Sequence, residues 1–159
     1  METNEILNKL FEECNLNKKE DLFSKKFKDK KTGKVTQMTI IKKSGIEKII
    51  SHKKIKITYD IICSEPLFAS VKAKGEYNGI YAETTGSAFP KNSTNNYYLE
   101  MAEKRSMSRI VLKLTNLSFY NVMGEDELID QNPTNNSLNQ SEISDISNKL
   151  EALKDKKSN

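Results

Sequence analysis

The dipeptide Asn78-Gly79 constrains this chain most, because it predicts a tight turn between two alternating segments, 67–77 and 80–89. A type I′ turn needs positive φ at both central residues, which asparagine and glycine tolerate. A two-residue turn also sets the strand register, since the residues that flank it must face each other. One face of the predicted hairpin then carries mostly small side chains, which lets a helix approach closely. They are Leu67, Ala69, Val71, Ala73, Gly75, Ala82, Thr84, Gly86 and Ala88.

The segment 96–117 is the expected occupant of that face. It is the longest run with helical periodicity and no Gly or Pro, and its apolar residues recur at three- and four-residue steps. Arg105, Arg109 and Lys113 recur every four residues and form a second, basic stripe. We expect the apolar stripe to pack on the sheet. We expect the basic stripe, together with Lys104, to contact nucleic-acid phosphates.

A third strand at 54–62 completes a three-stranded antiparallel meander. The sheet face opposite the helix is polar, as expected of an antiparallel sheet with one solvated side. Lys74 opposes Glu83 on that face, which predicts a cross-strand ion pair. Lys72 opposes Thr85, so we expect Lys72 to be freer to contact a ligand. The candidate phosphate contacts on the sheet are Lys54, Lys56, Lys72 and Lys74.

The part of the chain before the meander predicts a short amphipathic helix at 3–14, a strand at 35–41 and a helix at 45–51. Ser44 precedes the second helix and Glu47 follows three residues later, which is the pattern of a capping box. The first helix is expected to close the core, although contact with a neighbouring subunit is the alternative.

Residues 15–34 are dense in Lys and Asp, and the segment 28–34 predicts a turn. Two interpretations of its lysine run stay open. The run is either a solvated loop or an arm that contacts phosphates.

The charge of the chain is uneven, with a balance of +8 over residues 1–119 and −4 over residues 120–159. A basic body with an acidic tail is common in nucleic-acid-binding proteins, but a soluble lysine-rich surface also explains the charge. We expect an α+β core domain at 1–123. We expect a flexible acidic and Asn-rich tail at 124–159, with a short helix at 142–156.

Residue types that would carry catalysis are scarce. Cys14 and Cys63 stand apart, and one histidine is too few to complete a four-ligand zinc site with them. There is no Gly-rich phosphate loop. A metal-dependent nuclease site at Glu125–Asp130 ranks last among the hypotheses, because these carboxylates follow a glycine and lack a predicted rigid support. We therefore expect a binding protein rather than an enzyme, with no metal and no cofactor.

No apolar run approaches the ~20 residues that a membrane span needs. The acidic, amphipathic N-terminal segment is unlike a signal peptide. These observations favour a cytoplasmic protein without a membrane partner.

A resemblance to the phage and prophage single-strand annealing proteins is carried by two stretches, IIKKSGIEKI (40–49) and YYLEMAEKRSMSRIVLKLTNL (97–117). The family segment reads much like EMAEKRAxSRAVLKLxG and is followed by an acidic GEDE-like stretch, here at 124–127. These families are related to the Rad-fifty-two recombination proteins, whose core is a short helix, a three-stranded antiparallel meander and a long basic helix. Near the helix end this chain has Asn116 where the family pattern more usually has a glycine. The matching helix positions are Ala102, Glu103, Lys104, Arg105, Ser108, Arg109, Val111, Leu112, Lys113 and Leu114.

The resemblance implies a homo-oligomeric ring or filament that binds single-stranded DNA and anneals complementary strands in phage-type recombination and repair. It implies no nucleotide hydrolysis, and the cytoplasm of the host cell if the chain is phage-encoded. A host single-strand binding protein is a candidate partner for the tail. Candidates for base stacking are Tyr97, Tyr98 and Tyr81. The alternative hypothesis is a protein-interaction module, an inhibitor or adaptor, that acts through the acidic tail.

Overall fold

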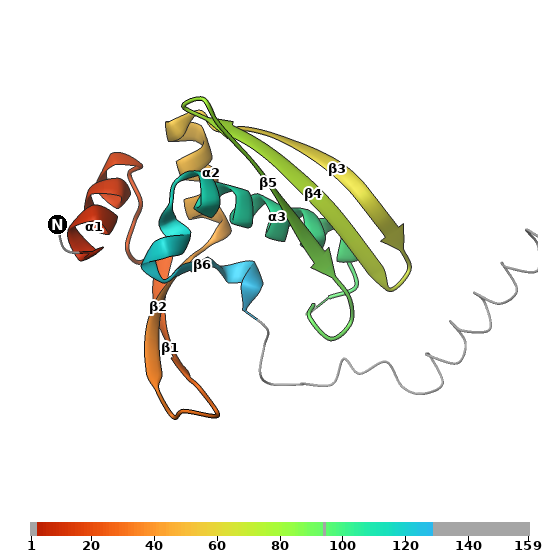
Figure 1. Ribbon diagram of the computed structural model, residues 1–159, viewed down its shortest axis with the longest axis horizontal. Helices are drawn as coiled ribbons and strands as arrows, with labels where there is room; N and C mark the ends of the chain where they lie inside the picture. Colours follow the sequence, from red (N-terminus) through yellow and green to blue (C-terminus); the bar gives the residue numbers. More distant parts are fainter. Residues whose placement is uncertain (1–2, 94, 129–159) are drawn as a thin grey trace, which may run out of the picture. The chain divides into compact units, whose positions relative to one another are not determined.

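The computed structural model describes residues 3–93 and 95–128. Within them the chain forms three α-helices, two three-stranded sheets and two single-turn 3-10 helices, so the expected α+β class is confirmed (Figure 1). The expected tail helix at 142–156 lies outside the described residues. In chain order the elements are α1 (Thr3–Glu13), β1 (Leu22–Lys28), β2 (Val35–Ile41), α2 (Lys43–Lys53), β3 (Lys56–Glu65), β4 (Phe68–Tyr77), β5 (Ile80–Ala88), α3 (Tyr98–Leu114), η1 (Leu117–Tyr120), β6 (Val122–Gly124) and η2 (Glu125–Glu127).

The meander forms as predicted, with the strand order β3-β4-β5 and antiparallel pairing throughout. Tyr77 pairs with Ile80, and the register runs without a shift to Ala69 and Ala88. The turn residues Asn78 and Gly79 both have positive φ, at 49° and 74°. The register prediction is therefore confirmed.

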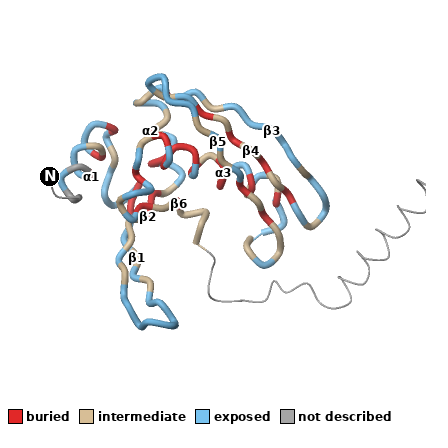
Figure 2. Tube along the Cα trace, viewed as in Figure 1, coloured by how far each residue is buried: buried red, intermediate tan, exposed pale blue. Residues whose placement is uncertain are grey.

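Helix α3 packs on the small-residue face of β4 and β5, and Figure 2 shows buried positions alternating along β4. The approach is closest at Gly86, where an added Cβ would lie 2.3 Å from the carbonyl oxygen of Ala102. The helix is shorter than predicted because Asn116 adopts a left-handed conformation with φ 59°. Asparagine tolerates this region better than most residues, so it ends the helix where a glycine is more usual.

A second sheet, with the order β1-β2-β6, was not predicted as such. Strand β1 pairs antiparallel with the predicted strand β2, and the three-residue β6 pairs parallel with the end of β2. The lysines of β1 obscure its alternation of apolar and polar residues. Strand β6 is too short to show periodicity, and only its pairing with Thr39–Ile41 makes it a strand.

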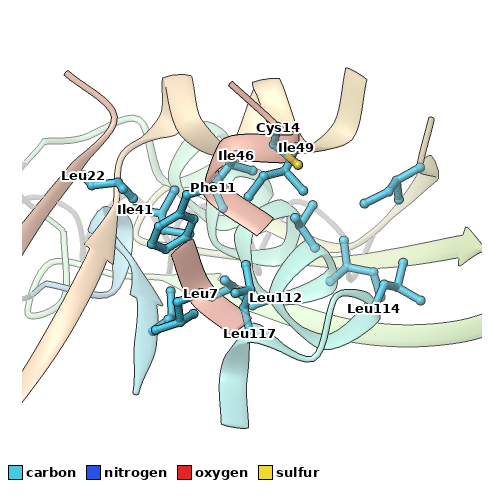
Figure 3. Close-up of a cluster of buried hydrophobic side chains, with 14 of the residues drawn as sticks. Leu7, Phe11, Cys14, Leu22, Ile41, Ile46, Ile49, Leu112, Leu114 and Leu117 are labelled. Atoms are coloured by element: carbon cyan, nitrogen blue, oxygen red, sulfur yellow. The ribbon is translucent and has the colours of Figure 1, made fainter. Parts of the chain in front are cut away.

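The main hydrophobic core lies where the three α-helices meet the first residue of β1 and the last residue of β2 (Figure 3). Leu7 and Phe11 of α1 are buried there against residues such as Ile41, Ile46 and Leu112. The expectation that the first helix closes the core is confirmed. No helix in the described part of the chain is both long and apolar enough to cross a membrane.

The predicted capping box of α2 is wrong. The helix begins at Lys43, and the hydroxyl of Ser44 donates to Oδ1 of Asp21 at 2.6 Å instead of capping the helix. The backbone N–H of Lys43 donates to Oε1 of Glu125 at 2.8 Å. Glu125, distant in sequence, thus takes the capping role that a local residue was expected to have, while Asp21 binds the Ser44 hydroxyl.

The buried Asp21 directly precedes β1 and connects the segment 17–21 with helix α2. Its carboxylate also accepts from Nζ of Lys48 at 2.6 Å and from the backbone N–H of Asn17 at 2.8 Å. Burial raises the pKa of Asp21, but the hydrogen bonds from Lys48, Ser44 and Asn17 outweigh it, so the net pKa lies below the ordinary 3.8.

We expect Asp21→Asn to lower the free energy of unfolding by about 1–3 kcal/mol at pH 7, because a charge-assisted hydrogen bond is lost at a buried site. A folded-state pKa below the unfolded one gives stability that is present above about pH 4 and is lost as pH falls through the folded pKa. Urea unfolding between pH 2.5 and 7 measures both effects. Equal acid sensitivity in wild type and variant would contradict this role.

Candidate nucleic-acid interface

Arg105, the first cation of the predicted basic stripe, is only 4% exposed. Its Nε donates to the carbonyl of Asp126 at 2.8 Å, its Nη1 to that of Ser87 at 2.7 Å, and its Nη2 to that of Asn92. Burial lowers the pKa of this guanidinium from its ordinary value. Arg105 thus joins α3 to its neighbours, and the prediction that it lies on an exposed phosphate-binding stripe is wrong.

Arg109 and Lys113 lie at the surface but also contact β5. Nη1 of Arg109 donates to the carbonyl of Thr85 at 2.6 Å, and Nη2 donates to the carboxylate of Glu127 at 2.8 Å. The hydrogen bonds that Arg109 donates to the carboxylate of Glu127 raise the pKa of Arg109. Nζ of Lys113 lies 3.3 Å from the carbonyl oxygen of Glu83. Arg109 is therefore matched by an acid of its own chain, whereas Lys113 has no carboxylate partner in the described part of the chain.

The stripe fits strand β5 because the two repeats have nearly the same length. Four residues of a helix rise about 6 Å, and two residues of a strand span about 6.6 Å. Successive cations of α3 therefore meet successive carbonyls of β5, at Ser87, Thr85 and Glu83. An edge strand with unpaired carbonyls invites pairing with another strand. The four-residue spacing that predicted phosphate binding is thus also what covering an edge strand requires.

The lysines on the outer face of the sheet are largely paired. Lys74 opposes Glu83 in the register, as predicted, but its Nζ pairs with Asp60 at 2.6 Å. Glu83 pairs instead with Lys72 at 3.3 Å. The expectation that Lys72 is the freer of the two is therefore wrong, because its side chain reaches the diagonal neighbour Glu83 rather than only the opposed Thr85.

Three other predicted phosphate contacts differ in their surroundings. Lys104 pairs with Glu100 one helical turn away, at 2.8 Å. Lys54 and Lys56 are exposed and have no ion pair among residues 3–93 and 95–128. Of the eight predicted basic site residues, only Lys54, Lys56 and Lys113 are both exposed and without an acidic partner in that range.

The three candidate stacking tyrosines also differ. Tyr98 is only 6% exposed and belongs to the core, so it is not available to a base. Tyr97 and Tyr81 are exposed. Tyr97 lies in a shallow groove that is also lined by Glu65, Glu100 and Glu103, which would repel phosphates.

The acidic segment 125–127 is not the start of a loose tail, because each of its carboxylates has a separate structural contact. Glu125 caps α2, Glu127 pairs with Arg109, and Oδ1 of Asp126 accepts from the hydroxyl of Ser108 at 2.8 Å. Burial raises the pKa of Asp126. Among the described residues no three His, Cys, Asp or Glu side chains are grouped so as to hold a metal ion. Asp130, the last member of the proposed nuclease cluster, lies outside the described residues.

Within the described residues, the strongest concentration of unpaired cations lies on the hairpin β1–β2, here called the finger (residues 22–41). The finger holds six lysines and one aspartate, a net charge of +5. None of these lysines has an ion pair within the described ranges. In Figures 1 and 2 its turn end is exposed and points away from α2 and α3. The lysines are Lys25, Lys26, Lys28, Lys30, Lys31 and Lys34.

The turn of the finger has a defined conformation. The carboxylate of Asp29 accepts from the backbone N–H groups of Lys31 and Thr32, each at 2.7 Å, and these bonds lower the pKa of Asp29. Gly33 has φ 70°, which a glycine adopts without strain. The single acid of the finger therefore holds the turn, and the lysines project from a preorganised hairpin.

The signal for this finger was present in the sequence. A predicted turn at 28–34 directly before a predicted strand at 35–41 implies a partner strand on the other side of the turn. Phe23, Lys25 and Phe27 share one face of that strand, and Nζ of Lys25 lies 5.7 Å from the centre of the Phe27 ring. A finger of this kind combines cations with partly exposed aromatic rings.

Comparison of the chain with protein-family models, with curated proteins and with solved structures gives no match.

Proposed function

We propose that this protein binds single-stranded DNA and anneals complementary strands without hydrolysing a nucleotide. The observation that carries the proposal is the finger, with six lysines and no acid partner for any of them in the described residues. The order of a short helix, an antiparallel meander and a long helix agrees with the core that the resemblance to annealing proteins implies, and so supports the proposal.

The chemistry of annealing suits such a surface. A protein that pairs strands should bind the phosphates and leave the base edges free, which lysines do without reading sequence. The proposed contacts are the finger lysines, with Lys54, Lys56 and Lys113 as additional cations. Arg105 and Arg109 are proposed to support the fold at β5.

The test combines two measurements on the full chain. Fluorescence anisotropy with a labelled oligo-dT should show binding that weakens steeply as salt rises from 50 to 200 mM. Energy transfer between two complementary labelled strands should rise faster with the protein than without it, in EDTA and without nucleotide. Salt-insensitive binding or an unchanged annealing rate would contradict the proposal. Cleavage of the strands on adding magnesium would favour the nuclease hypothesis instead.

A further inference from the structure

Strand β3 is the open edge of the meander. The other edge, β5, is covered by three cations of α3 that donate to its carbonyls. No side chain in residues 3–93 and 95–128 donates to a carbonyl of β3, and Figure 2 shows this strand exposed along most of its length. One edge of the meander, β5, is therefore covered by donors from α3, whereas the other edge, β3, is open to pairing.

Strand β3 also exposes large apolar side chains. Tyr59 and Ile61 are on the face that meets α3, because they pair with the buried residues Ala73 and Val71. The helix covers β4 and β5 but leaves Ile61 62% exposed and Ile62 55% exposed. An apolar edge strand of this kind is a template for pairing with another strand.

The sequence of β3 is complementary to itself in antiparallel orientation. When Thr58 of one copy is placed opposite Thr58 of another, each Lys56 faces an Asp60 and each Ile57 faces a Tyr59. Opposite charges then meet on the outer face and apolar side chains meet on the inner face. The register shift between Ile61 and Cys63 limits the paired stretch to the part of the strand up to Ile61.

We propose that two copies of this chain associate through antiparallel β3 strands, centred on Thr58, to form a two-fold dimer with a continuous six-stranded sheet. The contact is isologous, so it closes on itself and gives a dimer in place of the ring or filament that the resemblance to annealing proteins implies. Head-to-tail growth by adding β3 of one copy to β5 of the next is blocked by the cations at β5. This inference does not depend on DNA binding, and its test uses no DNA.

The first experiment measures mass. Sedimentation equilibrium of the wild-type protein should give twice the 18.2 kDa chain mass. Ile61→Lys should raise the dissociation constant at least about tenfold, because a charge on the edge opposes pairing. Phe119→Lys is the matched control, since Phe119 is 81% exposed and lies outside the meander; it should leave the dimer intact. Circular dichroism and the unfolding midpoint verify that both variants fold.

The second experiment tests the register. In a Cys63→Ser background, Thr58→Cys should form a disulfide-linked dimer under mild oxidation, because opposed residues of antiparallel strands have Cα atoms about 4.5–5.5 Å apart, within disulfide range. Thr85→Cys, on the same sheet face but on β5, should not. A monomeric wild type, a larger assembly unaffected by Ile61→Lys, or equal cross-linking at both positions would overturn the proposal.

Discussion

Replacing the five exposed finger lysines with glutamine should weaken binding to single-stranded DNA by about a thousandfold at 0.1 M salt. They are Lys26, Lys28, Lys30, Lys31 and Lys34. Each contact between a cation and a phosphate of a single strand contributes about 0.7 to the slope of log affinity against log salt. Five lost contacts therefore reduce the slope by about 3.5. Anisotropy titrations at four salt concentrations measure the affinity and the slope together.

The control variant removes five positive charges from the surface outside the finger. Lys9, Lys18, Lys19, Lys43 and Lys91 are exposed and lie outside the finger, so their joint change to glutamine alters the net charge equally. It should reduce the slope by less than about 1. Equal losses in the two variants would show that net charge alone, rather than the finger, drives binding. If the double variant Arg109→Gln, Lys113→Gln lost more DNA affinity than the finger variant, the binding site would lie on α3 instead.

Gly86→Ala should lower the free energy of unfolding by about 3 kcal/mol or more. The added Cβ would lie 2.3 Å from the carbonyl oxygen of Ala102 and 2.6 Å from the backbone nitrogen of Ser106. Both atoms belong to the backbone of α3, so relief requires the whole helix to move away from β5. That movement would also disturb the carbonyl contacts of Arg105. Urea unfolding followed by circular dichroism measures the loss.

Gly75→Ala provides the comparison on the same sheet face. Its added Cβ would lie 2.7 Å from Cγ1 of Ile110 and from Cδ1 of Leu114. These are side-chain atoms that can change rotamer, so the expected cost is about 1–2 kcal/mol. A cost at Gly75 equal to or above that at Gly86 would contradict the view that contact with the helix backbone is what excludes a side chain.

Much of the meander could be predicted from local signals. Asn78 and Gly79 specified the turn, the turn specified the register, and the register identified the face on which α3 packs. Strands β1 and β6, and with them the second sheet, were not predicted, for two different reasons. The lysines of β1 masked its alternation, and β6 is a strand only because residues 122–124 meet the end of β2.

The candidate site was predicted less well, because charge spacing does not reveal what a charge faces. Arg105 and Arg109 have the spacing of a phosphate-binding stripe, yet they contact carbonyls of β5 and residues 126 and 127. Asp126 follows Arg105 by 21 positions, and Glu127 follows Arg109 by 18. Lys72 was expected to be free because its directly opposed residue, Thr85, carries no charge. In a sheet, a long side chain also reaches the diagonal neighbour.

The amino-acid sequence by itself determined the α+β class, the turn at 78–79 and the apolar stripe of α3, since these depend on residues close together in the chain. Only the tertiary structure decided which cations remain without an acid, because a lysine or arginine is neutralised by whatever the fold brings within a few ångströms. Most cations of the α3 stripe contact carbonyls of the edge strand β5 or the acidic segment 125–127. Those on the finger project from a hairpin whose single acid holds its own turn.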